Sequence, residues 1–137
     1  MPRAVPVAAR LLAMMVLVTT AACSSSGGGR PTTPATLQIL APAPNAVTGP
    51  TVELKLELAH AKLVPATETG GAIRGDRGHV HVSVDGTLVS MAFTLDQPIP
   101  VLSAGVHTIQ AEFVASDHLP FKNRVVAAVT FRVNGGG

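Results

Sequence analysis

The sequence predicts an all-β protein, an antiparallel β-sandwich of about seven short strands. Beyond residue 35 the apolar side chains recur mainly with a period of two, as they do in strands with one buried face. The pair Asp85-Gly86 stands between two such segments and is a preferred pair for a two-residue hairpin turn. Outside the first 22 residues no segment shows a convincing helical period.

Seven segments carry the strand pattern. The clearest runs over 52–58, where Val52, Leu54, Leu56 and Leu58 alternate with charged residues. The segment 99–101 is flanked by prolines, which suits only an edge strand. In chain order the expected strands are 37–40, 52–58, 79–85, 89–93, 99–101, 106–114 and 124–133. The sandwich is therefore expected to occupy 36–134.

The N-terminus has the form of an export signal. Arg3 and Arg10 form a positively charged region before an apolar run over 11–18, and small residues at 20–22 precede Cys23. A run of this length is too short to cross a hydrocarbon core, which needs about 20 residues. We therefore predict a removable signal peptide over 1–22.

The junction at Cys23 adds a membrane anchor to this prediction. The stretch 18–23, Val-Thr-Thr-Ala-Ala-Cys, resembles a bacterial lipobox, although Thr20 stands where leucine is commoner. The resemblance implies that Cys23 becomes the lipidated N-terminus, carrying diacylglycerol and palmitate. The alternative is an ordinary secretory signal followed by a free thiol. Lipidation would hold the protein at the extracytoplasmic face of the cell membrane, with a flexible tether over 23–35.

Charge and cysteine content limit which kinds of protein the chain can be. Two of the ten basic residues lie in the signal, so from Cys23 onward eight basic residues balance eight acidic ones. This balance argues against nucleic-acid binding. The lone cysteine excludes an intrachain disulfide.

Three short motifs resemble those of small exported bacterial immunoglobulin-like domains. They are Gly-His-Val-His at 78–81, Gly-Val-His-Thr at 105–108 and Asp-His at 117–118. The resemblance covers roughly 52–133 and implies an immunoglobulin-like sandwich. The chain has no Trp or Tyr, so the conserved tryptophan and tyrosine of antibody domains are absent.

The histidines suggest a candidate metal site. If the strands follow the usual sandwich order, His60, His79, His81 and His118 gather with Asp117 at one pole. Neutral imidazoles and a carboxylate suit copper or zinc. The alternatives are that His79 and His81 are outward polar residues bonded to a neighbouring strand or to the loop 61–78, or that they bind another ligand.

His107 is expected to have a structural role. It keeps phase with Ile109, Ala111 and Phe113, so we expect a buried histidine held by backbone carbonyls at the opposite pole. No enzymatic motif is present, and we predict no catalysis and no required cofactor. The function expected is a lipid-anchored binding or structural module of the cell envelope, with the membrane and an unidentified envelope protein or ligand as partners. The alternative is an envelope protein that binds copper or zinc.

Overall fold

The computed structural model describes residues 1, 29–65, 67–69, 71–92 and 94–135. Most of the expected signal, and the expected lipidation site Cys23, lie outside the described residues. In the described part of the chain, no helix is long and apolar enough to cross a membrane.

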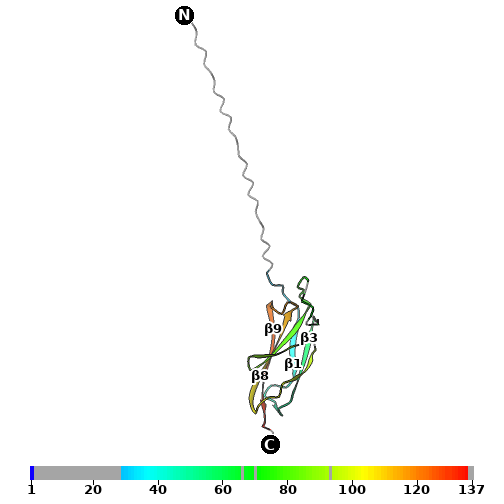
Figure 1. The fold of residues 1–137 in the computed structure, drawn as a ribbon, viewed down its shortest axis with the longest axis vertical. Helices are drawn as coiled ribbons and strands as arrows, with labels where there is room; N and C mark the ends of the chain where they lie inside the picture. Colours follow the sequence, from blue (N-terminus) through cyan, green and yellow to red (C-terminus); the bar gives the residue numbers. More distant parts are fainter. Residues whose placement is uncertain (2–28, 66, 70, 93, 136–137) are drawn as a thin grey trace.

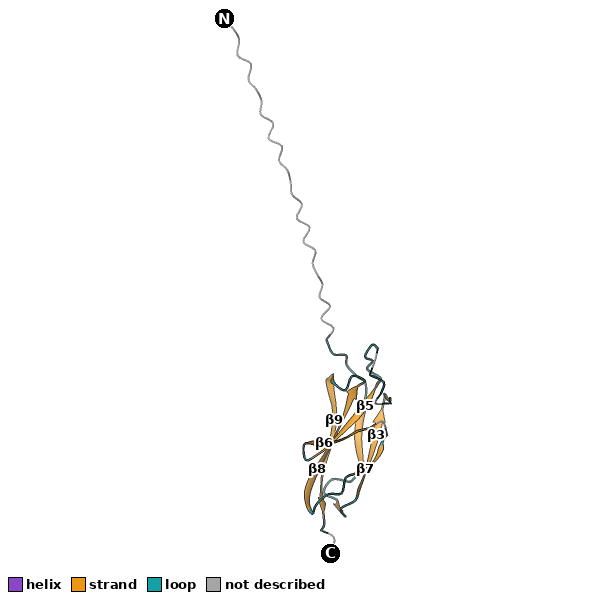
Figure 2. Cartoon of the chain, viewed as in Figure 1, coloured by secondary structure: helices purple, strands orange, loops and turns teal. Residues whose placement is uncertain are grey.

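The chain folds into nine strands within the described residues, arranged in two sheets (Figures 1 and 2). In order they are β1 (Thr36–Ala41), β2 (Val47–Thr48), β3 (Val52–Ala59), β4 (Lys62–Leu63), β5 (Arg77–Val84), β6 (Thr87–Ala92), β7 (Asp96–Ile99), β8 (Gly105–Ala115) and β9 (Pro120–Val133).

One sheet has the order β1-β3-β7, and the other has the order β2-β9-β8-β5-β4 with β6 also paired to β5. All pairings are antiparallel except those of the two-residue strands β2 and β4, which run parallel to β9 and β5. The two sheets enclose one apolar core. The protein is thus an immunoglobulin-like β-sandwich, as the sequence predicts.

The core forms because each long strand turns one set of alternate side chains inward. On β3, Val52, Leu54 and Leu56 are buried while the charged residues between them are exposed. On β8, Phe113 is fully buried and its ring packs against that of Phe121, with centroids 5.4 Å apart. Burying a side chain of this kind contributes about 1.5–3 kcal/mol. The same two-residue period therefore decides which side chains remain outside.

The expected hairpin at Asp85-Gly86 is confirmed. Both residues have positive φ, 50° and 82°, as a type I′ turn requires. The edge strand differs from expectation, because β7 covers Asp96–Ile99 and Val101 is 76% exposed beyond it. Proline at 100 interrupts the strand just after Ile99.

The packed part of the chain begins earlier than residue 36. The Lys122 amide donates to the carbonyl of Pro31 at 3.0 Å. Thr33 and Asn123 exchange two hydrogen bonds, of 2.9 and 2.8 Å. The segment 30–35, expected to belong to the tether, is therefore bonded along the start of β9.

Candidate functional site

Three histidines gather at the end of the sandwich where β8 turns into β9. His79 and His81 lie on β5, and His118 lies in the turn 116–119. The His118 ring stacks on the His79 ring with centroids 4.4 Å apart and planes 17° apart. His81 Nε2 lies 3.2 Å from His118 Nδ1. The strand order predicted from the sequence does bring these three residues together.

His79 is the buried member of the group. It lies on the face of β5 opposite Val80, as alternation predicts, yet its exposure is 0%. The loop after β4 and the turn 116–119 cover it. Its Nδ1 lies 2.9 Å from the carbonyl of Val64, and its Nε2 lies 3.4 Å from that of Ser116. The ring is therefore placed between two backbone acceptors.

His81 is only partly buried. Burial lowers its pKa below the usual value of 6.5, and the neighbouring His118 and His79 lower it further because their positive charges would repel its own. The negative charge of Glu112 raises the pKa of His81 and so opposes this effect. The carboxylate of Glu112 is itself bound by Arg124, at 2.7 and 2.6 Å.

His118 is held by the turn that carries it. Its amide donates to the carbonyl of Ala115 at 2.8 Å, and the Ala115 amide donates to the carbonyl of Leu119 at 3.0 Å. The backbone of His118 is in the left-handed region, with φ of 63°. Such a conformation is uncommon for a residue with a side chain, and histidine adopts it more readily than most.

Asp117 does not face the imidazoles as a free carboxylate. Both its oxygens accept hydrogen bonds from Arg30, one of them at 3.0 Å. Arg30 also donates to the carbonyls of Leu119 and Pro120, at 2.7 and 2.8 Å. The hydrogen bond from Arg30 holds the pKa of Asp117 below its usual value. Asp117 therefore chiefly holds the start of the folded segment in place. The sequence did not reveal this role, because the composition of the surrounding segment placed Arg30 in the tether.

His60 lies apart from the other imidazoles. It is exposed and borders a hollow of about 300 Å³ that Ala61, Lys62 and Asp76 also line. No ring contact joins it to another histidine of the described chain. Over the same residues, no group of three or more His, Cys, Asp or Glu is arranged to hold a metal ion. Of the four imidazoles and the carboxylate expected to converge at this pole, three imidazoles contact one another, and two of these approach through ring nitrogens.

His107 lies at the opposite end of the sandwich and is buried, with 9% of its surface exposed. Its Nε2 donates to the Ser103 carbonyl at 2.8 Å, and its Nδ1 lies 2.7 Å from the Asp85 carboxylate. Only one of its two partners is thus the backbone carbonyl expected. The hydrogen bond to Asp85, followed by the one to Ser103, raises the pKa of His107. Asp85 joins the β5–β6 turn to β8, since its second oxygen accepts the Thr108 amide at 2.8 Å.

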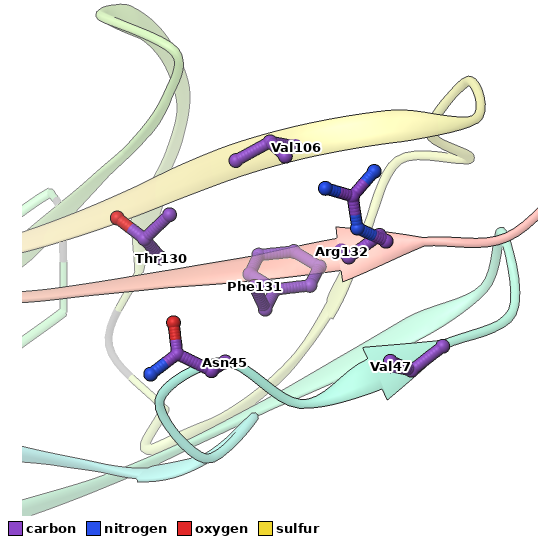
Figure 3. A pocket seen from close by; sticks show the side chains of 6 residues that line it. All are labelled: Asn45, Val47, Val106, Thr130, Phe131 and Arg132. Atoms are coloured by element: carbon purple, nitrogen blue, oxygen red, sulfur yellow. The ribbon is translucent and has the colours of Figure 1, made fainter.

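A further hollow, of about 140 Å³, lies beside β2, β8 and β9 (Figure 3). Val47 and Val106 border it and are 61% and 56% exposed. The only sequence signal for it is an apolar residue at an outward position, Val106, directly before the inward His107. Its lining is Asn45, Val47, Val106, Thr130, Phe131 and Arg132.

No protein family matches the chain, and no curated protein is similar to it. Three solved structures are similar in fold. The fibronectin(III)-like modules of Clostridium thermocellum CbhA have a TM-score of 0.48 and 16% identity, over 72% of this chain and 94% of that one. The PKD domain of human KIAA0319 has a TM-score of 0.45 and 15% identity, over 83% and 96%. A CARDB domain from Pyrococcus furiosus, in complex with di-metal ions, has a TM-score of 0.36 and 18% identity, over 72% and 91%.

Proposed function

We propose that the protein is an exported, lipid-anchored module of the bacterial cell envelope that binds a partner or serves a structural role, without catalysis. The observation that carries the proposal is the lipobox-like stretch 18–23, which precedes a β-sandwich whose first strand begins at Thr36. His79 and His107 lie beside backbone carbonyls or a carboxylate. His81 and His118 lie beside one another, and none of these pairs places a nucleophile beside a base.

The start of the fold sets how far the domain stands from its anchor. Arg30 is fixed by Asp117 and by two carbonyls of the β8–β9 turn and β9. Seven Cα–Cα steps separate Cys23 from Arg30, which corresponds to a reach of about 25 Å when extended. A lipid on Cys23 would thus keep the end of the sandwich that carries His79, His81 and His118, the histidine pole, nearest the membrane.

The anchor is tested in a bacterial host that expresses the full chain and is fed an alkyne-bearing palmitate analogue. We expect the label and the protein in the membrane fraction, with both lost in Cys23→Ser. Ser26→Ala is the matched control and should behave as wild type. A labelled Cys23→Ser chain, or an unlabelled wild-type chain, would refute the anchor.

Export is tested separately by adding protease to spheroplasts. Degradation of the domain without lysis places it at the extracytoplasmic face. Protection that is relieved only by lysis would contradict export.

A further inference from the structure

At the histidine pole, His81 and His118 approach each other through ring nitrogens. The ring nitrogens Nε2 and Nδ1 are 3.2 Å apart. Two imidazole nitrogens bound to one tetrahedral zinc ion, each at 2.0–2.1 Å, are about 3.3–3.4 Å apart. Neighbouring nitrogens of a square-planar copper site are closer, at about 2.9 Å. The observed separation lies between these values.

The two histidines are held in this arrangement by their surroundings. His81 lies on β5, which is paired with β8 on one side and with β6 on the other. The tight turn around Ala115 fixes the backbone of His118, and the buried ring of His79 supports its imidazole from one face. The two ring nitrogens share a hydrogen bond, so a metal would take the place of the shared proton between two ligands that already lie side by side.

The other groups at this pole have partners elsewhere. Asp117 is bound by Arg30, and Glu112 is bound by Arg124. Both nitrogens of His79 lie beside backbone carbonyls. Each of the two carboxylates is thus balanced by its own arginine, and neither approaches the pair as a free ligand.

We propose that His81 and His118 form a two-histidine site for a divalent transition metal, binding through His81 Nε2 and His118 Nδ1. Water completes the coordination. Imidazole ligands suit copper, zinc and nickel, and the general order of affinities places Cu²⁺ above Zn²⁺. The site is independent of the lipid anchor, because every group that forms it belongs to the sandwich.

The test is calorimetric titration of the full chain, purified in detergent and freed of metal by a chelator, with CuCl₂ and then with ZnCl₂. We expect one equivalent of Cu²⁺ to bind, and Zn²⁺ to bind more weakly at the same site. His81→Asn and His118→Asn should each weaken binding by about tenfold or more, since even the loss of an outer-shell partner has an effect of this size. His60→Asn is the matched control and should bind as wild type does.

A second measurement uses only the wild-type chain, so it does not depend on the folding of a variant. Zn²⁺ is added to protein labelled with ¹⁵N-histidine, and the imidazole nitrogen resonances are recorded. We expect His81 Nε2 and His118 Nδ1 to shift while those of His60 and His107 do not. Absence of binding, binding that survives both substitutions, or shifts confined to other histidines would overturn the proposal.

Discussion

The substitution Gly78→Ala is expected to destabilise both the sandwich and the histidine pole. Gly78 pairs with Ala115 near the start of β5, directly before His79. A Cβ atom at this position would clash with the carbonyl oxygen of Val114 and would lie 3.0 Å from a ring atom of Phe113. The first contact involves backbone, so rotation of a side chain cannot relieve it.

The size of the effect follows from this geometry. Overpacking a well-packed core costs about 1–3 kcal/mol, and a clash with paired backbone belongs at the upper end. For a domain of this size, a change of 1 kcal/mol moves the melting temperature by about 4–8 °C, so a loss of about 3 kcal/mol lowers it by about 12–24 °C. β5 would also separate from the end of β8, which leads into the turn carrying His118.

The assay is thermal unfolding of the full chain followed by circular dichroism, with Gly49→Ala as the control. Gly49 has no atom within 4 Å of an added Cβ and its backbone is outside the left-handed region. The control should therefore lie within about 0.5 kcal/mol of wild type. If the free energy of unfolding of Gly78→Ala is within about 1 kcal/mol of the control, the close approach of β5 and β8 is not as described.

Three further predictions concern the ion pairs and the core. Arg30→Ala should lower the urea concentration at the midpoint of unfolding, because it removes the hydrogen bonds that tie the segment 30–35 to Asp117 and to the start of β9; no change would mean that 30–35 does not pack. Phe113→Ala should cost about 3–5 kcal/mol in the same titration, and a cost below about 1 kcal/mol would contradict its complete burial. The raised pKa of His107 means that its charged form is favoured by folding, so this stabilisation is complete below pH 6.5 and is lost as pH rises through the folded pKa. In Asp85→Asn the difference in stability between pH 6 and pH 9 should shrink; an unchanged pH profile would show that Asp85 is not the cause.

The different environments of His79 and His81 illustrate what the alternation of side chains can and cannot predict. The period of two places His79 and His81 on one face of β5, and the expected strand order places His118 near them. Alternation says nothing of what covers that face. The loop after β4 buries His79 and leaves His81 partly exposed, so two residues with the same sequence signal differ in environment.

The sequence alone determined the long strands, the Asp85-Gly86 hairpin and the inward side chains, because these depend on local conformational preference and on a period that each strand carries by itself. It did not reveal the two-residue strands β2 and β4 or the bounds of β7. Tertiary structure alone decided which partners the polar groups take. Arg30 reaches Asp117 across 87 positions, and His107 finds Asp85 across 22. Contacts between residues so distant leave no pattern along the chain, since they arise only when the packing of the two sheets brings the turns together.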